Sequence, residues 1–446
     1  MFMNILQEFD TITAIATPIG TGGVGVIRIS GDKSFEIIDK IYSKHNLEEG
    51  KISHGWIIDG DKKIDEVILL PFKNPKSYTG EDVIEIHCHG GINVVRNILD
   101  IVLKNGARMA EKGEFTKRAF LNKKMDLSQA EAVADLIHAK TKDFAKQSAK
   151  NLSGVLSKKI KEIRNNIFNV LSKIIAGIDF PEDVQEPEYE YLISEFEKAL
   201  KEINDILASA NSSNIMRQGI KIAILGKPNV GKSSLFNTLL NVERAIVTDI
   251  AGTTRDVITE TLDWDVAITL VDTAGIRDKN EVDRVEEIGI EYSKQSAQEA
   301  DLILFLYDAS KGINNDDKII LDLINGKKHI VIANKADLTT ERNSETFYLS
   351  TVTKEGLNEL KEQIKTLAYD FSLEDTEFIT NTRQQDCLLK CRESLSQALN
   401  AAKARQLQDL ISIDLKSALL FLDEITGEVI TDEILNNIFD HFCIGK

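Results

Sequence analysis

The sequence predicts a multidomain α/β protein in which an α/β domain with a mostly parallel sheet interrupts a helical region. The chain has 446 residues, which corresponds to roughly three domains at the usual domain size. Short apolar runs at 220–225, 302–307 and 330–333 alternate with helical patterns, which is typical of buried parallel strands. Helical periodicity continues on both sides of this segment, over residues 120–211 and 382–443.

The composition is that of a soluble globular chain, with 42% hydrophobic and 28% charged residues, and it excludes a wholly disordered protein. No apolar run is long enough for a transmembrane helix, and the start lacks the basic cluster of a signal or transit peptide. Four scattered cysteines indicate a reducing compartment, so we expect a cytoplasmic protein. The net charge of −17 argues against unselective binding to nucleic acid.

Residues 1–118 predict an N-terminal α/β domain. A strand bounded by glycines is expected at 24–29, and strict alternation of apolar and polar residues predicts another strand at 83–89. A glycine pair then opens a helix over 92–104, which an Asn-Gly pair stops. The polar face of the second strand carries Glu85, His87 and His89.

Residues 119–214 predict the first half of a helical domain, with helical periodicity over 129–173 and again over 189–210. An α/β domain is expected at 215–370, and residues 371–446 predict the second helical half. We expect the two halves to form one domain into which the α/β domain is inserted. Two separate helical domains are also compatible with the sequence.

The sequence Gly-Lys-Pro-Asn-Val-Gly-Lys-Ser at residues 226–233 follows a predicted strand and precedes a predicted helix, as a phosphate-binding loop requires. Its glycines let the backbone N–H groups point at phosphates. Lys232 is expected to reach the β- and γ-phosphates, and the Ser233 hydroxyl to ligate Mg²⁺. The alternative is a glycine-rich turn without function.

Further motifs, in the right order, argue against a mere turn. Asp272-Thr273-Ala274-Gly275 follows a predicted strand. Its aspartate is expected to hold the metal ion through water, and its glycine N–H to contact the γ-phosphate. Asn334-Lys335-Ala336-Asp337 follows another strand, and its last carboxylate can accept both N–H groups of the guanine edge. The set resembles a Ras-like P-loop GTP-binding domain. The loop behind the base departs from the usual Ser-Ala-Lys and contains Ser350, Thr351 and Val352.

The segment between these motifs supplies a switch loop, in which Thr254 is the expected second Mg²⁺ hydroxyl. Ile276 stands where Ras-type enzymes carry a water-orienting glutamine. Asn229 and the long loop before Thr254 suggest a K⁺ ion that bridges phosphate oxygens instead. Acids after Ile276 could orient water, although they also fit a solvated helix face. The remaining predicted GTP-binding residues are Val230, Gly231, Ser234, Thr248, Asp249, Ile250, Ala251, Gly252 and Thr253.

Motifs outside the GTPase segment extend over the whole chain. They include Ala16-Thr17-Pro18, Ser77-Tyr78-Thr79-Gly80-Glu81-Asp82, Asp126-Leu127-Ser128-Gln129-Ala130, Ile178-Asp179-Phe180-Pro181, Glu424-Ile425-Thr426-Gly427-Glu428 and the terminal Phe442-Cys443-Ile444-Gly445-Lys446. With them the chain resembles the MnmE (TrmE) family of tRNA modification GTPases. The resemblance implies an N-terminal folate-binding and dimerisation domain, and a helical domain that holds an inserted GTPase.

The resemblance also implies partners and chemistry. Members of the family form homodimers and, with the flavoprotein MnmG, a heterotetramer that modifies C5 of the wobble uridine of certain tRNAs. The added group is aminomethyl or carboxymethylaminomethyl. The carbon comes from 5,10-methylenetetrahydrofolate or a related tetrahydrofolate, and FAD enters only through the partner. GTP hydrolysis in the family needs Mg²⁺ and is stimulated by K⁺.

The resemblance also assigns roles to individual residues of this chain. The resemblance implies a water-orienting Glu286, with the neighbouring Glu287 as the alternative, beside Lys232 and Asn229 as the other catalytic groups. The implied K⁺ ligands are Asn229, Thr248, Ile250 and Thr253, and the Mg²⁺ ligands are Ser233 and Thr254. The implied folate contacts are Arg28, Glu85, Lys124 and Lys446. Cys443 either takes part in one-carbon chemistry or is simply buried.

Other functions stay open at this point. A ribosome-assembly GTPase that acts as an RNA-binding switch shares the switch motif, but usually adds a compact basic RNA-binding module. A folate-dependent methyltransferase-like enzyme with a regulatory GTPase would need no flavoprotein. Residues 120–173 carry 11 basic and five acidic residues, a net +6. This stretch is either a solvated helix face or a local surface for tRNA.

Overall fold

The computed structural model describes residues 10–139, 141–208, 219–242, 258–263, 267–272, 297, 300–340, 342–343, 346–372 and 380–446. The chain divides into two compact units. The first comprises Met1–Ala134, Lys150–Ala199 and Lys390–Lys446, and the second comprises Asp135–Ala149 and Leu200–Leu389. The domain boundaries expected from the sequence, after residues 118, 214 and 370, stay predictions.

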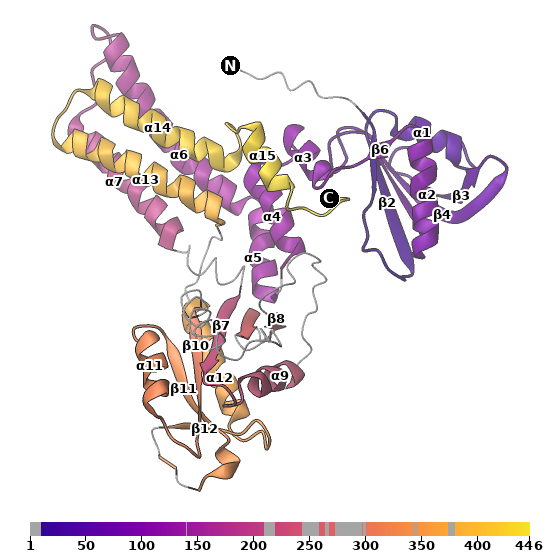
Figure 1. Ribbon diagram of the computed structural model, residues 1–446. Coiled ribbons are helices and arrows are strands. Elements are labelled where there is room, and N and C mark those ends of the chain that lie inside the picture. Colours follow the sequence, from indigo (N-terminus) through magenta and orange to yellow (C-terminus); the bar gives the residue numbers. More distant parts are fainter. Residues whose placement is uncertain are drawn as a thin grey trace. The chain divides into compact units, whose positions relative to one another are not determined.

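The first unit contains a mixed six-stranded sheet (Figure 1). Its spatial order is β3-β4-β5-β2-β1-β6, and only β1 and β6 run parallel. The strands are β1 (Ile12–Ile15), β2 (Val24–Ser30), β3 (Ser53–Asp59), β4 (Lys62–Phe72), β5 (Val83–His89) and β6 (Arg108–Met109). The predicted strand at 83–89 is confirmed over its full length.

Helices α1 (Ser34–Ile41) and α2 (Ile92–Lys104) cover one face of this sheet. Their apolar sides join a core with Ile27, Ile84 and Ile86 of the strands. Because side chains alternate along a strand, Arg28 and Glu85 belong to the opposite face. The helix predicted over 92–104 is confirmed, and it ends at the expected Asn105.

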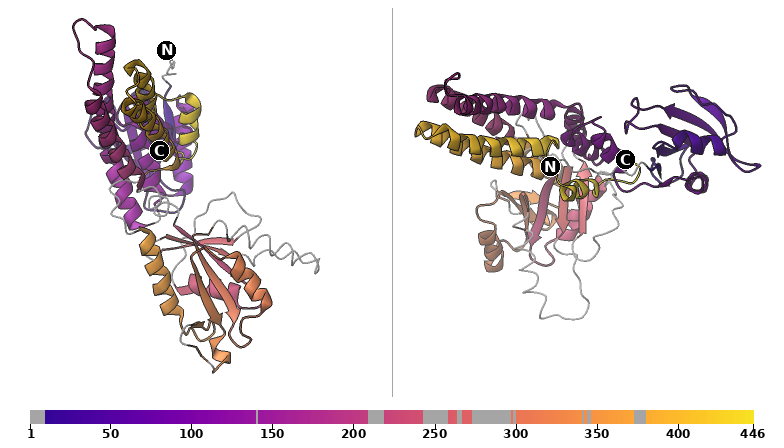
Figure 2. Two further views of the ribbon diagram at one scale, coloured as in Figure 1. Left: turned by 90° about the vertical axis from the view of Figure 1, so that its left-hand side faces the viewer. Right: turned by 90° about the horizontal axis from the view of Figure 1, so that it is seen from above.

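The helical part of the first unit is built from segments far apart in the sequence. Its helices are α3 (Glu114–Leu121), α4 (Leu127–Ile137), α5 (Lys142–Leu152), α6 (Val155–Asp179), α7 (Tyr189–Ala208), α13 (Thr382–Lys403), α14 (Gln408–Thr426) and α15 (Asp432–Phe439). Most of α5 and one end each of α4, α7 and α13 belong to the second unit. Helix α14 lies along α6 (Figure 2). Leu127, Ala130 and Val133 share one core with Leu435 and Phe439. The helical sequences before and after the predicted α/β segment at 215–370 therefore pack together.

The periodicity over 129–173 does not correspond to one helix. Two interruptions separate α4, α5 and α6. The second lies at Gly154, whose φ of +90° in the left-handed region suits glycine, and α6 begins directly after it. The apolar spacing continues across this break, so periodicity alone did not reveal it.

The second unit contains the predicted sheet, in the order β12-β11-β10-β7-β9-β8 with only β8 antiparallel. Its strands are β7 (Ile220–Gly226), β8 (Ile258–Asp263), β9 (Ala267–Asp272), β10 (Leu302–Asp308), β11 (His329–Asn334) and β12 (Phe347–Leu349). The three apolar runs of the sequence are the strands β7, β10 and β11, as predicted.

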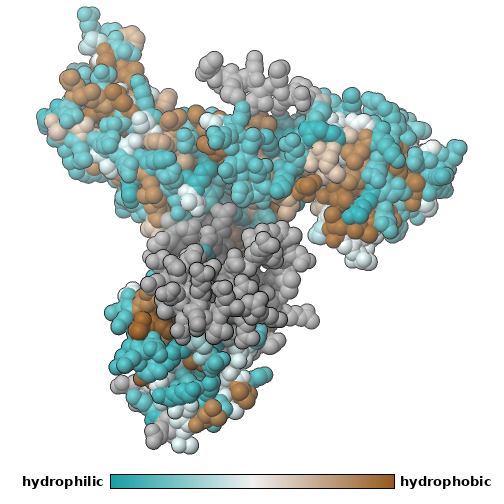
Figure 3. Space-filling model, in the orientation of Figure 1, coloured by the Kyte–Doolittle hydropathy of each residue, from teal (hydrophilic) through white to brown (hydrophobic). Residues whose placement is uncertain are grey.

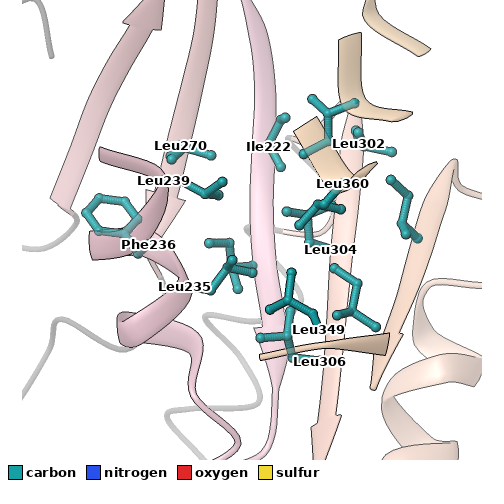
Figure 4. Close-up of a cluster of buried hydrophobic side chains, with 14 of the residues drawn as sticks. Ile222, Leu235, Phe236, Leu239, Leu270, Leu302, Leu304, Leu306, Leu349 and Leu360 are labelled. Atoms are coloured by element: carbon teal, nitrogen blue, oxygen red, sulfur yellow. The ribbon is translucent and has the colours of Figure 1, made fainter. Parts of the chain in front are cut away.

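Helices cover both faces of this mostly parallel sheet, which explains its continuous apolar strands. Leu235, Phe236 and Leu239 of α9 (Lys232–Val242) and Leu360 of α12 (Leu357–Ser372) pack on one face (Figure 4). Side chains of α11 (Asn315–Leu323) and Ile324 pack on the other.

Within the described ranges, no helix has the length and apolar character needed to cross a membrane. Hydrophilic residues cover much of the coloured surface in Figure 3, with smaller hydrophobic patches between them.

Candidate functional sites

The phosphate loop connects β7 to α9 and has the backbone conformation that its glycines and asparagine permit. Gly226, Asn229 and Gly231 have φ values of +148°, +63° and +101°, a region that favours glycine and tolerates asparagine. A Cβ at Gly226 would lie 2.2 Å from the carbonyl oxygen of Leu306. Val230 is buried, whereas Ser233 and Ser234 are exposed at the start of α9. The loop therefore presents its polar side chains and helix N-terminus to solvent, where a phosphate can bind.

The Lys232 ammonium is held over this loop by two carbonyls of the loop itself. Its Nζ donates to the oxygens of Gly226 and Lys227, at 2.7 and 2.9 Å. A lysine ammonium has three donors. The arrangement fixes the cation at the place where the sequence predicts phosphate contacts.

The guanine-recognition motif lies at the end of β11, beside the phosphate loop. Asn334 is fully buried, and its Nδ2 donates to the carbonyl oxygen of Val230 at 2.8 Å. Lys335 has a φ of +64°, and its Nζ lies 2.8 Å from Asp308 Oδ2. Burial raises the pKa of Asp308, but hydrogen bonds from Lys335 and Ser310 outweigh burial and leave this pKa below its ordinary value. The Asp308 carboxylate thus stays charged and anchors Lys335.

Asp337 and Ser350, predicted on separate loops, are brought together. The Ser350 hydroxyl donates to Asp337 Oδ1 at 2.5 Å, and it accepts from the backbone N–H groups of Val352 and Thr353. Asp337 is exposed on the short helix Ala336–Leu338. Thr351 is half-buried, and Val352, where the usual motif has lysine, is 80% exposed. The carboxylate is oriented by the serine while it stays open to a base.

The remaining predicted GTPase residues are only partly described. The backbone of Asp272 ends β9, where the residue pairs with Ile224 of β7 next to the phosphate loop. The other members lie outside the described residues, namely Thr248, Asp249, Ile250, Ala251, Gly252, Thr253, Thr254, Thr273, Ala274, Gly275, Glu286 and Glu287.

A second polar site lies on the face of the N-terminal sheet that α1 and α2 leave uncovered. Arg28 of β2 and Glu85 of β5 are directly opposite in the antiparallel register. Arg28 Nε and Nη2 both donate to Glu85 Oε1, at 2.9 and 2.8 Å. The other carboxylate oxygen lies 3.3 Å from His87 Nε2. Burial raises the pKa of Glu85, but the charge and hydrogen bonds of Arg28 outweigh it, so this pKa is lowered and the group is ionised.

Aromatic side chains that sequence reasoning did not select complete this site. The Arg28 guanidinium lies 5.1 Å from the ring centre of Tyr78 and 5.6 Å from that of Phe115. The Tyr78 hydroxyl shares a 2.9 Å hydrogen bond with Thr116 Oγ1. Tyr78 belongs to the Ser-Tyr-Thr-Gly-Glu-Asp motif of residues 77–82, and Phe115 lies in the first turn of α3. Their proximity to Arg28 depends on contacts between distant segments, so no local pattern indicated it.

The C-terminal residues dock against this site. The carbonyl oxygens of Cys443 and Lys446 accept from the backbone N–H groups of Gly113 and Phe115. Burial and the nearby charge of Arg28 lower the pKa of the Lys446 ammonium, and the charge of Glu85 acts in the opposite direction. The structure thus brings together three of the four predicted folate contacts.

The fourth predicted folate contact, Lys124, is placed differently. Its Nζ donates to the carbonyl oxygen of Pro75 at 2.9 Å. Its side chain packs near Gly80, two residues after Tyr78 in the same loop. Cys443 is exposed and forms no disulfide bond within the described residues, whereas Cys387 and Cys391 are buried.

Within the described part of the chain, no group of three or more His, Cys, Asp or Glu residues could hold a metal ion. The parallel sheet, the phosphate loop at the carboxyl end of β7, and the Asn334–Asp337 motif define a P-loop GTP-binding protein.

Comparisons with known proteins extend this class to the whole chain. The MnmE helical domain matches residues 127–443, and the GTP-binding protein TrmE N-terminus matches residues 11–124. The chain is 44% identical to the tRNA modification GTPase MnmE of Thermoanaerobacter pseudethanolicus over 460 residues, covering 98% of this chain and 100% of the relative. It is also 44% identical to the tRNA modification GTPase MnmE of Clostridioides difficile over 458 residues, covering 98% and 99%. The chain belongs to the MnmE family of tRNA modification GTPases.

Among solved structures, Era of Aquifex aeolicus bound to GDP and aluminium fluoride is 29% identical. That match covers 39% of this chain and 66% of Era, with a TM-score of 0.26. The assignment to the family rests on the sequence matches over the whole chain.

Proposed function

We propose that this protein is a K⁺-stimulated GTPase that acts in tRNA modification with a flavoprotein partner. Together they add an aminomethyl or carboxymethylaminomethyl group to C5 of the wobble uridine. One observation carries the proposal: a single chain combines a GTP-binding loop with a polar, aromatic-lined site closed by its own C-terminal lysine. A ribosome-assembly switch has no use for the second site.

The GTPase residues have defined tasks in this proposal. Lys232 neutralises charge on the β- and γ-phosphates, and Asp337 selects guanine because its carboxylate accepts two N–H groups. Ser233, exposed at the helix start, would hold Mg²⁺ together with Thr254. Asn229, with Thr248, Ile250 and Thr253, would hold K⁺, and Glu286 would orient the attacking water. These last assignments follow the family pattern.

The N-terminal site suits a tetrahydrofolate. Arg28 Nη1 is buried and has no hydrogen-bond partner in the described part of the chain, so it is a donor that a ligand oxygen could satisfy. Glu85 is an ionised acceptor for the guanidine-like edge of a pterin, and the rings of Tyr78 and Phe115 offer apolar surface beside it. A tetrahydrofolate bound here would supply the one-carbon unit. Lys446 then offers a cation near the bound ligand.

The central experiment deletes the gene and measures wobble uridines by nucleoside mass spectrometry. We expect the C5 group to disappear, to return with the wild-type gene, and to stay absent with Lys232→Ala. Unchanged C5 modification after deletion would refute the proposed function. A ribosome-assembly defect with normal C5 modification would favour the alternative.

The cation is tested by GTP turnover in KCl and in NaCl. We expect faster hydrolysis in KCl, and Asn229→Ala should remove most of the difference. Equal rates in the two salts would contradict the K⁺ assignment while leaving GTP hydrolysis intact.

The folate site is tested by titration with 5-formyltetrahydrofolate. Arg28→Met and Glu85→Gln should each weaken binding by about tenfold or more, because each leaves a half-buried charge without its partner. Lys62→Met, an exposed lysine on β4, is the matched control and should bind normally. Normal binding by both site variants would show that folate binds elsewhere.

A further inference from the structure

The second residue of the phosphate loop, Lys227, is tied to the first turn of α11. Its Nζ lies 3.0 Å from Asp317 Oδ2. The Asp317 side chain is only 1% exposed, and that of Lys227 is 25% exposed. A buried carboxylate strongly requires a compensating cation. Asp317 lies outside the GTP-binding motifs, and Lys227 lies within the phosphate loop but is not among the residues predicted to bind GTP.

The position of Asp317 is itself fixed. Asp317 Oδ2 accepts from the backbone N–H of Asn314, and the Asn314 side chain accepts from the backbone N–H of Asp317, which forms a reciprocal capping box. Asp317 Oδ1 is buried and makes no hydrogen bond within the described ranges. Lys227 therefore supplies a positive charge to a buried carboxylate that the helix start holds in place.

Lys227 also contacts the phosphate-binding lysine. Its carbonyl oxygen accepts from Lys232 Nζ at 2.9 Å. A continuous path of contacts thus runs from Asp317 through the side chain and backbone of Lys227 to the Lys232 ammonium. A shift of Lys227 would move one of the two carbonyls that hold this ammonium in position.

We propose that Asp317 is a positioning residue for GTP binding, which acts through Lys227 on the phosphate-binding ammonium of Lys232. Asp317 does not touch the nucleotide. Through Lys227 it keeps the first residues of the phosphate loop in the conformation that binds a nucleoside di- or triphosphate. This inference rests on the proposed GTPase function and adds a residue to its phosphate site.

The test compares Asp317→Asn with Asp316→Asn in the full-length protein. Asparagine at 317 retains an acceptor for the helix cap but loses the charge. We expect the KM for GTP and the Kd for a fluorescent GDP analogue to rise about tenfold, and kcat to change less than about threefold, because the ground-state phosphate contact is weakened. Asp316 is exposed in the same helix turn, so its variant should match wild type.

Two further variants separate positioning from helix stability. Lys227→Met should reproduce the rise in KM. Lys227→Arg should keep KM and Kd close to those of the wild type because it retains the positive charge. The double variant Lys227→Met/Asp317→Asn should be no weaker than the single variants. Circular dichroism melting of each variant shows whether it is folded under assay conditions.

Three results would overturn the inference: a wild-type KM in Asp317→Asn, an equal loss in Asp316→Asn, or additive losses in the double variant. These outcomes differ from a failure of the proposed function. If the proposed function were wrong, the wild-type protein itself would not hydrolyse GTP.

Discussion

Asn334 Nδ2 donates a 2.8 Å hydrogen bond to the carbonyl oxygen of Val230, and so joins the guanine-recognition motif to the phosphate loop. The contact is tight, because a Cβ at the neighbouring Gly231 would lie 2.2 Å from the same nitrogen. The loop proposed to recognise the base is therefore in direct contact with the loop proposed to bind the phosphates. A change in one loop should alter affinity for both parts of the nucleotide.

Asn334→Ala should weaken nucleotide binding by about tenfold or more. It leaves the carbonyl oxygen of Val230 without its donor, at a cost of about 1–3 kcal/mol for a buried group. Titration with a fluorescent GDP analogue measures the effect. Asn325→Ala, at an exposed turn position, is the control and should bind normally. Unchanged affinity in Asn334→Ala would contradict a role for this contact in shaping the phosphate loop.

Asp337→Asn should change base specificity from guanine toward xanthine. A carboxylate accepts two N–H groups, whereas an amide offers one donor and one acceptor, which match the C2 carbonyl and N1–H of xanthine. We expect GTP affinity to fall about a hundredfold or more, because an unpaired polar group remains at the base. Competition between GTP and XTP measures the change.

Ser350→Ala provides a graded comparison for the base site. It removes the hydroxyl that orients the Asp337 carboxylate but retains the carboxylate itself. We therefore expect a smaller loss of GTP affinity and no gain for XTP. A gain for XTP in Ser350→Ala would mean that loop disorder, and not the amide donor, changes specificity.

The sequence predicted the core of the GTPase sheet well, because strands buried on both faces appear as continuous apolar runs. The runs at 220–225 and 302–307 correspond to β7 and β10 almost residue for residue. The helix over 92–104 was equally clear, since glycines precede it and an asparagine cap ends it. The end of α5 was missed, because Gly154 interrupts the helix without disturbing the apolar spacing.

Some of the site residues could likewise be predicted from the sequence, and others could not. Lys232, Asn334 and Asp337 belong to local motifs with fixed spacing, so sequence alone could select them. The ion pair of Lys227 with Asp317 joins residues 90 positions apart along the chain, and no local pattern predicts it. The roles of Thr248, Thr254 and Glu286 stay predictions from the family resemblance.

Gly445→Ala should weaken folate binding while GTP turnover stays unchanged. Gly445 has a φ of +98°, and a Cβ there would lie 2.3 Å from the carbonyl oxygen of Ile15. The terminal residues must then move, and Lys446 leaves its place beside Arg28 and Glu85. Titration with 5-formyltetrahydrofolate should show a loss at least as large as that of Lys446→Ala. Gly312→Ala, at a loop glycine with open space around it, serves as the glycine control. Wild-type folate binding in Gly445→Ala would contradict this role of the C-terminal tail.

A network of ion pairs between Glu114 and two arginines near the start of α3 should make the stability of the first unit depend on pH. Glu114 accepts hydrogen bonds from Arg108 and Arg118, and its side chain is only 9% exposed. Burial raises the pKa of Glu114, but hydrogen bonds from Arg108, the Glu111 backbone and Arg118 outweigh burial, so the folded pKa lies below 4.5. A lowered pKa means that the folded state binds fewer protons than the unfolded state. The stabilisation is therefore complete above about pH 4.5 and is lost as the pH falls through the folded pKa.

Glu114→Gln should consequently lower the free energy of unfolding on the order of 2 kcal/mol at pH 7, where charged hydrogen bonds are lost. The difference from wild type should shrink as the pH falls below about 4.5. Urea unfolding followed by Trp56 fluorescence measures it, in a Trp264→Phe background that leaves one tryptophan in the N-terminal sheet. Glu36→Gln is the control, because its pair with Lys40 is exposed and contributes little. A difference that stays constant from pH 7 to pH 3.5 would mean that Glu114 stabilises the fold through packing and not through its charge.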